Sequence, residues 1–433
     1  MSTTPAPPVR IGALAPLTRP GWTEAGRHLL AGLELAVAET NAGGGIDGRP
    51  LELVVRDTAA DPRRAEAAVG ELAGLGVAAL AGEYHSVAAR AAAARADALG
   101  LPFLCSSAVL DALTERPTDR VARLAPAQSH GWRVYADFLL AAGHGHVAVA
   151  AEPSLYWAAG TRILRDHLTP RGGTVTELDA HAHAPAALCD ALAGGGVRTS
   201  GSARAGESAR AGGSVRTSGS ARTGGGVRAG GGVRIGGGAP DDGGAASGGG
   251  ARGGGGARPA GAATALLLLT GFPDPAVPIV RAVRRDPRLA GLLVGAPAGQ
   301  PEFAAWADLL GGDGAAIPFL RYLPEHPTPL GSRVETALRS RLAAAPSFVA
   351  FEGYDTITVL AETLRTHGTD RATVAGSWPR VAVEGTRGPI RFTRPAGTPV
   401  QQWAWPPVQV ADRDPAAPSR FRTLHTAAAG ARV

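Results

Sequence analysis

Few side chains in this sequence have the types and spacing that covalent chemistry requires. His144-Gly-His146 and His181-Ala-His183 offer two imidazoles each, but a structural zinc site takes four ligands, and no cysteine or further histidine lies at ligand spacing. The chain has no Gly-x-Ser-x-Gly segment to hold a nucleophilic serine. Gly43-Gly44-Gly45 follows a predicted helix, whereas phosphate-binding loops follow a strand. We therefore expect no catalytic residue, no metal site and no cofactor.

Ser86 is the strongest candidate for a side chain that binds a ligand. It stands directly before Val87–Leu99, an alanine-rich segment that predicts a helix. Its hydroxyl, together with the first free backbone N–H groups of that helix, can hold a carboxylate or carbonyl oxygen. The alternative is a plain helix cap with no ligand. We predict that Ser86 contacts the ligand.

Alternating strands and helices are expected to position this residue. Strands are predicted at Val9–Leu17, Leu51–Val55, Val77–Ala81, Pro102–Cys105, His146–Ala151, Thr174–Leu178, Ala265–Thr270 and Leu292–Gly295, with helical segments between them. This order indicates parallel sheets covered by helices on both faces.

Ligands of such sheets lie beyond the carboxyl ends of the strands. That rule selects the loops Thr18–Thr23, Glu83–Ser86, Ser106–Val109, Glu152–Trp157, Gly271–Asp274 and Ala296–Gln300. Later elements are a helix at Pro346–Leu364 and strands at Gly388–Phe392 and Gln401–Val410.

Four segments, in this order, resemble the leucine/isoleucine/valine-binding and amide- or urea-binding family of type I periplasmic (solute) binding proteins. They are Ile11–Thr18, Asn41–Asp57 followed by Asp61-Pro62, Gly82–Ser86, and Glu352-Gly-Tyr-Asp355. Gly388–Phe392 is similar to the family's return strand. The resemblance implies an α/β fold of two Rossmann-like lobes, joined by three hinge crossings, with a ligand in the cleft and no enzymatic activity.

The resemblance also implies a division of the chain. Residues 9–126 with 325–384 would form the N-terminal lobe, and 127–193 with 263–324 and 385–412 the C-terminal lobe. Residues 194–262 would be a disordered low-complexity insertion and 413–433 a disordered tail.

Six residues are expected to bind the ligand. Ser86 matches the family's ligand-binding serine, and Tyr84 matches the aromatic residue that precedes it in the amide- and urea-binding branch. Tyr156 and Phe272 match cleft aromatics of the second lobe, although each could instead be packed under its loop. Trp22 and Ser107, from two further strand-to-helix loops, complete the set.

The chain departs from the family at positions that decide the ligand. The acidic residue that pairs with an amino acid's ammonium group falls near Pro297 or Ala298 here, which argues against an ordinary zwitterion unless Glu83, Glu152 or Asp274 substitutes. Val109 replaces a hydroxyl residue of the amino-acid branch, and Cys105-Ser106-Ser107 does not match the amide branch. The ligand therefore stays open among amino acids, amides and urea-like solutes.

The insertion at 194–262 carries the chain's excess positive charge. It holds nine arginines, most of them six residues apart, and three acidic residues, which gives a charge of +6. Because the whole chain also has a net charge of +6, the remainder of the chain has no net charge. This argues against a folded nucleic-acid-binding face. A β-helix would need a bulky aliphatic residue in each hexad, whereas glycine dominates here, so disorder is the prediction. An arginine-glycine arm that touches nucleic acid is the remaining alternative.

The expected function is that of the substrate-binding protein of an ABC-type importer for a small polar solute. The partners would be that solute and, if the protein is exported, an ABC permease; neither nucleic acid nor membrane embedding is expected. Met1–Arg10 lacks an apolar signal region and a lipid-accepting cysteine. As written, this favours the alternative of a cytoplasmic ligand sensor resembling the amide-responsive regulators; a start upstream would restore an extracytoplasmic importer component.

Overall fold

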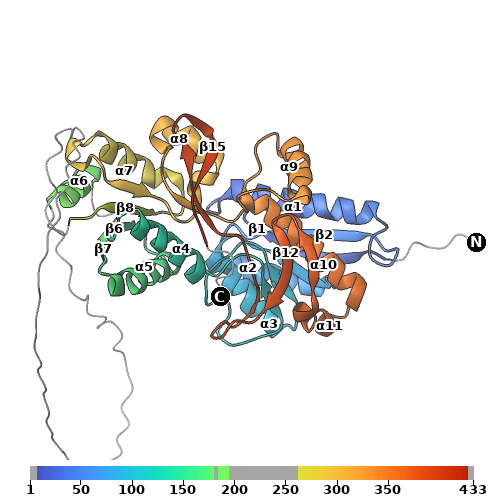
Figure 1. Cartoon of the computed structure of the whole chain (residues 1–433). Coiled ribbons are helices and arrows are strands. Elements are labelled where there is room, and N and C mark those ends of the chain that lie inside the picture. The colour runs from blue at the N-terminus through green and yellow to red at the C-terminus, as the bar shows by residue number, and fades with distance from the viewer. Residues whose placement is uncertain (1–6, 180–183, 195–261, 428–433) are drawn as a thin grey trace, which may run out of the picture. The chain divides into compact units, whose positions relative to one another are not determined.

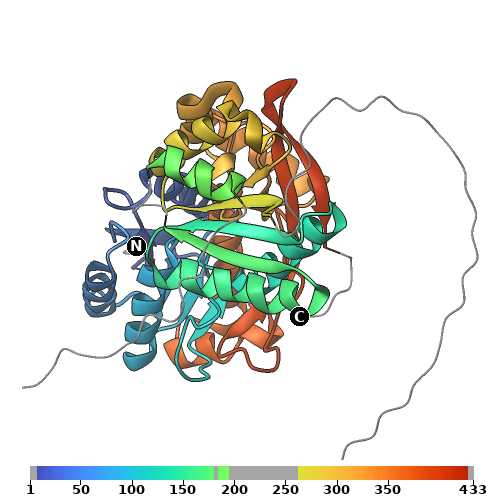
Figure 2. The same cartoon turned by 90° about the vertical axis from the view of Figure 1, so that its left-hand side faces the viewer.

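The computed structural model describes residues 7–179, 184–194 and 262–427. These residues form an α/β structure built on an eight-stranded, a four-stranded and a three-stranded sheet. The strands and helices around the eight-stranded sheet, blue and orange in Figure 1, are called the N-terminal lobe. Those around the two smaller sheets are called the C-terminal lobe, which faces the viewer in Figure 2. The predicted fold class is confirmed.

The N-terminal lobe has the strand order β11-β12-β13-β5-β4-β3-β1-β2, and β1 to β5 run parallel with β13. The strands are β1 (Val9–Ala15), β2 (Leu51–Asp57), β3 (Ala79–Gly82), β4 (Phe103–Cys105), β5 (Val121–Arg123), β11 (Ala382–Gly385), β12 (Gly388–Thr393) and β13 (Gln401–Trp403). The helices are α1 (Thr23–Ala42), α2 (Pro62–Gly74), α3 (Ser86–Ala98), α9 (Pro329–Leu342), α10 (Phe348–His367) and α11 (Arg371–Ala375).

Alternation along the strands places apolar residues on both faces of this sheet. Ile11 and Ala13 of β1 belong to the core under α1 and α10, whereas Leu14 belongs to the core under α2 and α3. α1 and α10 pack closely because glycines stand where they cross. A Cβ added at Gly32 would lie 1.9 Å from the Ala350 carbonyl oxygen, and one at Gly353 would lie 2.3 Å from that of Leu29.

The C-terminal lobe contains a fully parallel sheet of order β7-β6-β8-β9. Its strands are β6 (His146–Ala151), β7 (Thr174–Asp179), β8 (Ala265–Leu269) and β9 (Leu293–Gly295). Its helices are α4 (Gln128–Ala141), α5 (Leu155–Leu168), α6 (Pro185–Ala193), α7 (Pro273–Arg285) and α8 (Ala304–Leu310). Every residue of β8 is buried, because α4 and α5 cover one face of the sheet and α6 and α7 the other (Figures 1 and 2).

The third sheet consists of β10 (Phe319–Arg321), β14 (Gln409–Asp414) and β15 (Ala417–Thr426), all antiparallel. The chain therefore passes between the lobes three times: after β5, after β10 and after β13. Buried side chains tie these crossings together. The Arg123 Nε donates to Gln402 Oε1 at 2.7 Å, the Gln402 Nε2 donates to the Ala125 carbonyl at 2.6 Å, and the Gln409 Nε2 donates to the Leu323 carbonyl at 2.7 Å.

Two C-terminal segments differ from the sequence prediction. Residues 385–412 were assigned to the C-terminal lobe, but β12 and β13 extend the sheet of the N-terminal lobe, because Gln401 pairs with Ala122 of β5. Residues 413–433 were expected to be disordered, yet Ala417–Thr426 forms β15 against β14. β15 is largely exposed and has few apolar residues, so its sequence carries little strand signal; Phe421, which contacts Phe319, is its main anchor.

The predicted insertion at 194–262 lies almost wholly outside the described residues, as do His181 and His183. Within the described part of the chain, no helix is long and apolar enough to cross a membrane.

Candidate ligand-binding site

A cavity of about 280 Å³ lies between residues of the two lobes. Its walls are mainly aromatic, and its lining consists of Trp22, Ala60, Tyr84, His85, Ser86, Val87, Ser107, Val109, Glu152, Pro153, Ser154, Tyr156, Trp157, Thr270, Gly271, Ala298, Gln300, Tyr322 and Phe348. The volume is at the lower end of the range for small-molecule sites, which is roughly 300–1,000 Å³. The cavity thus fits one small organic solute.

Each of the six loops selected by the strand-end rule contributes to this lining. Five of the six predicted ligand-binding residues line the cavity: Trp22, Tyr84, Ser86, Ser107 and Tyr156. Phe272 does not. It immediately precedes α7, and its ring centroid lies 6.0 Å from that of Trp22, which does line the cavity.

Ser86 is not the helix cap that was the alternative to a ligand contact. α3 begins at Ser86 itself, and His85 is the N-cap residue, without a side-chain cap bond. The Ser86 Oγ instead accepts hydrogen bonds from the backbone N–H groups of Val109 and Leu110, at 3.2 and 3.3 Å. With its lone pairs engaged, the hydroxyl keeps its proton for an acceptor. Ser86 and Val87 both line the cavity in the first turn of α3, where backbone N–H groups have no intrahelical partner.

The loop before α3 is held by the buried Glu83. Its Oε2 accepts from the Thr58 hydroxyl at 2.5 Å, and its Oε1 accepts from the backbone N–H groups of Tyr84 and His85, at 2.8 Å each. Burial raises the pKa of Glu83, while these hydrogen bonds oppose the shift. Because both oxygens are engaged, Glu83 shapes the loop and is not placed to pair with a ligand's ammonium group.

Trp22 closes the cavity beside this loop. Its backbone N–H donates to the His85 Nε2 at 3.1 Å, and its ring lies 4.6 Å from the ring of Phe303 in the C-terminal lobe. Burial lowers the pKa of His85 to about 4, so this imidazole is neutral at pH 7. Nearby, Glu24 at the start of α1 accepts hydrogen bonds from the backbone N–H groups of Ala304 and Ala305, at 2.9 and 3.4 Å. The two lobes are in direct contact on this side.

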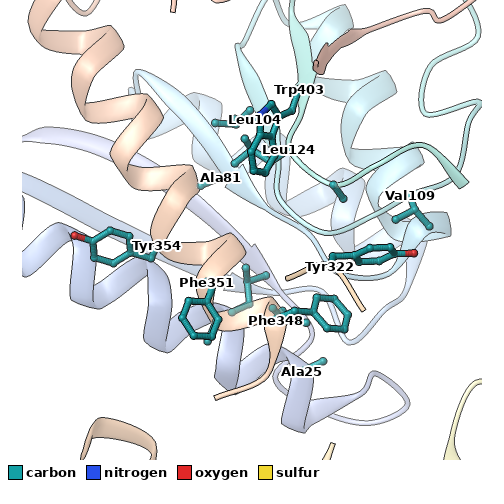
Figure 3. Packing of buried hydrophobic residues seen from close by; sticks show 14 of the residues in the cluster. Ala25, Ala81, Leu104, Val109, Leu124, Tyr322, Phe348, Phe351, Tyr354 and Trp403 are labelled. Carbon is teal, nitrogen blue, oxygen red and sulfur yellow. The ribbon is translucent and has the colours of Figure 1, made fainter. Parts of the chain in front are cut away.

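Three tyrosines surround the space beside Ser86. Burial raises the pKa of Tyr84, Tyr156 and Tyr322, so all three are neutral phenols. Figure 3 shows Tyr322 beside Phe348, and their ring centroids are 5.2 Å apart. Aromatic faces with hydroxyl ends suit a ligand that has both an apolar body and hydrogen-bonding groups.

A buried charge cluster lies next to the cavity. The Arg387 guanidinium donates to Glu352 Oε1 at 3.2 Å and to Asp355 Oδ2 at 2.9 Å, and all three side chains are fully buried. Burial raises the pKa of Glu352 to about 7, although the positive charge of Arg387 and the hydroxyl of Ser107 lower it.

Glu352 in turn raises the pKa of the cavity residues Tyr84 and Tyr322 through its negative charge, so it lies within electrostatic reach of both. The ion pairs join α10 to the β11–β12 turn. They therefore brace the side of the cavity that carries Ser107.

The C-terminal lobe supplies polar lining residues, among them Glu152, Thr270 and Gln300. The Glu152 Oε2 accepts from the backbone N–H of Gly271 at 2.7 Å. The Thr270 hydroxyl donates to the Phe272 carbonyl at 2.8 Å. The Gln300 Nε2 donates to the Thr270 carbonyl, and Gln300 is 1% exposed. Neither Pro297 nor Ala298 is acidic, so Glu152 is the acidic side chain in the described lining.

Tyr322, Phe348 and Gln300 line the cavity but were not among the residues predicted to bind the ligand. Tyr322 follows β10 and Phe348 begins α10, and both reach the cavity only because the chain crosses between the lobes nearby. Gln300 ends one of the selected loops, so the strand-end rule had located it without assigning it a role. No three His, Cys, Asp or Glu residues gather as a metal site among the residues that the structure describes.

Comparisons with known proteins agree with this geometry. Residues 8–212 match the family model described as periplasmic binding protein. The chain is 35% identical over 122 residues to Leu/Ile/Val-binding protein homolog 7 of Brucella melitensis and 37% identical over 78 residues to homolog 2 of Brucella abortus. These alignments cover 27% and 18% of this chain and only 29% and 21% of the relatives' own lengths.

Solved structures match nearly the whole chain. A leucine binding protein, LivK, from Thermotoga maritima has a TM-score of 0.68 at 16% identity, covering 96% of this chain and 97% of that protein. A solute-binding protein of an ABC transporter from R. palustris, in complex with benzoate, also reaches 0.68 at 16% identity, with 97% and 96% covered. LivJ from Streptococcus pneumoniae, in complex with isoleucine, reaches 0.66 at 16% identity, with 96% and 99% covered. The chain thus has the type I periplasmic binding protein fold, and its residues 8–212 are similar to the periplasmic binding protein family.

Proposed function

We propose that this protein is the substrate-binding component of an ABC importer and binds one small organic solute that carries a carboxylate. The observation that carries the proposal is the cavity itself, lined by strand-end loops of both lobes around Ser86 and the first turn of α3. A hydroxyl proton and unpaired helix N–H groups form a site for an anionic oxygen. No arginine is among the described residues that line this cavity, so the anion would be held by hydrogen bonds rather than by an ion pair.

The solute's body would pack against the aromatic walls. Similar proteins are titled as complexes with isoleucine, leucine and benzoate, which are small carboxylates with an apolar part. The relatives named above are Leu/Ile/Val-binding protein homologues, and this favours the importer over the cytoplasmic sensor and a carboxylate over urea. We expect the lobes to hinge at the three crossings, closing on the solute and presenting a surface to a permease.

A thermal-shift screen over amino acids, hydroxy acids, aromatic carboxylates, amides and urea tests the proposal. A solute that binds only the folded protein stabilises it by about 2.7 kcal/mol at a hundredfold excess over Kd, and the melting temperature rises accordingly. Stabilisation by small carboxylates is the expected result. A screen in which only urea or uncharged amides stabilise the protein would contradict the carboxylate.

Ser86→Ala tests the anion site directly. Loss of a hydrogen bond to a charged group is expected to weaken binding by about 1.5–3 kcal/mol in calorimetry. Ser340→Ala, which removes the same hydroxyl from an exposed position on α9, is the matched control and should bind like the wild type. If Ser86→Ala folds with the wild-type melting temperature and binds equally well, the carboxylate does not lie at this residue.

A further inference from the structure

The hydrogen-bonding groups of the cavity differ between the two lobes. On the N-terminal side, the Ser86 hydroxyl has a proton to donate, because its oxygen already accepts two backbone N–H groups. His85 also offers a donor there. Its Nε2 accepts the Trp22 N–H, so the neutral ring carries its proton on Nδ1. This side therefore favours acceptor groups on the ligand.

Gln300 provides the opposite chemistry on the C-terminal side. Its amide orientation follows from its neighbour: Nε2 faces the Thr270 carbonyl, and a flipped amide would place two carbonyl oxygens against each other. The Gln300 Oε1 must therefore point elsewhere, and it has no hydrogen-bond partner among the described residues. A buried acceptor without a partner destabilises the protein unless another group donates a hydrogen bond to it. Gln300 lines the cavity, so a ligand can supply it.

We infer that Gln300 selects the ligand by accepting a hydrogen bond on Oε1 from an uncharged hydroxyl or amide N–H group. The inference rests on the proposed function, in which the ligand's carboxylate lies against Ser86. The solute class that results is a small carboxylic acid with a hydroxyl or amide donor beyond the carboxylate. The amide carbonyl carries no charge to balance an ammonium group, so this acceptor suits an uncharged donor.

Two series of probes that differ in one group test this assignment. One comprises leucine, 2-hydroxy-4-methylpentanoate and 4-methylpentanoate; the other comprises phenylalanine, 3-phenyllactate and 3-phenylpropanoate. Each series presents ammonium, hydroxyl or hydrogen on the same skeleton. Calorimetry on the wild-type protein is expected to give about tenfold tighter binding for the hydroxy acid than for its hydrogen analogue, the factor for one hydrogen bond.

Substitutions at Gln300 should then change the selectivity rather than binding in general. Gln300→Met removes the acceptor and should bring the hydroxyl-to-hydrogen ratio to about one. Gln300→Glu adds a charge and should shift the preference from the hydroxy acid towards the amino acid by tenfold or more. Gln409→Met is the matched control. Gln409 is a buried glutamine whose Nε2 also donates to a backbone carbonyl, but it lies outside the cavity lining, so this variant should keep the wild-type ratio.

The outcomes distinguish failure of the proposed function from failure of the role assigned to Gln300. If no small carboxylate of the wider screen, these six included, raises the melting temperature of the wild type, the proposed carboxylate function is wrong, and this inference fails with it. If compounds bind but Gln300→Met leaves the hydroxyl-to-hydrogen ratio unchanged, the function stands and the role of Gln300 is refuted. Wild-type preference for the amino acid over the hydroxy acid by more than tenfold would also refute the uncharged donor.

Discussion

Stability should fall as pH rises through the neutral range because Glu352 is buried beside the cavity. Its pKa rises from 4.5 to about 7, chiefly because burial disfavours the carboxylate. Between these values the folded protein binds more protons than the unfolded chain, so the free energy of unfolding decreases as pH increases. At about 1.4 kcal/mol per pKa unit, the loss from this group is about 3 kcal/mol between pH 4 and pH 8.

Glu352→Gln removes this titration while keeping the shape of the side chain. Denaturant unfolding of the wild type and the variant at several pH values from 4 to 8 isolates the contribution, since every other group titrates in both. We expect the variant to become the more stable protein, relative to its value at pH 4, by about 3 kcal/mol at pH 8. Glu335→Gln, in an exposed pair with Arg339, is the control and should follow the wild type. Parallel curves for wild type and Glu352→Gln would refute the assignment.

Two further changes test the core and the insertion. Arg387→Met leaves Glu352 and Asp355 buried without their cation and should cost about 3–5 kcal/mol of unfolding free energy. Arg333→Met, in a largely exposed pair with Glu39, should cost under about 1 kcal/mol. Equal losses of the two variants in chemical denaturation would contradict the buried cluster. Deletion of 195–261 should leave ligand affinity within about twofold in calorimetry, because this segment joins α6 to the amino end of β8, whereas the cavity lies at the carboxyl ends; a large loss of affinity would show that it contributes to binding.

Local sequence signals located most elements and the site loops. The apolar run at Ala265–Thr270 became β8, and the segment from Val87 became α3, because a buried strand and a helix each leave a short-range pattern. β5 and β15 went unrecognised for the opposite reason. β5 has three residues, and β15 is mostly exposed, so neither has a pattern long or apolar enough to identify it.

The role of a side chain was harder to predict than its place. Ser86 was predicted to contact the ligand, with a plain helix cap as the alternative. It lines the cavity, and its oxygen accepts from the backbone N–H groups of Val109 and Leu110, in the loop after β4, which is the neighbour of β3 in the sheet. Phe272 was expected in the cleft, but it packs near Trp22, which lines the cavity where Phe272 does not. Both outcomes depend on contacts between residues more than twenty positions apart.

The order of most strands and helices and the loops that line the cavity follow from the sequence alone, since periodicity and the strand-end rule act over short distances. The division into two lobes was implied by the family resemblance. Only the tertiary structure decided which polar groups form hydrogen bonds within the protein and which are left to bind a ligand. Both carboxylate oxygens of Glu83 accept hydrogen bonds from Thr58 and from the backbone of its own loop, whereas the Gln300 Oε1 has no hydrogen-bond partner in the described chain. Hydrogen-bond saturation depends on which distant backbone groups folding brings near, and no local pattern encodes that.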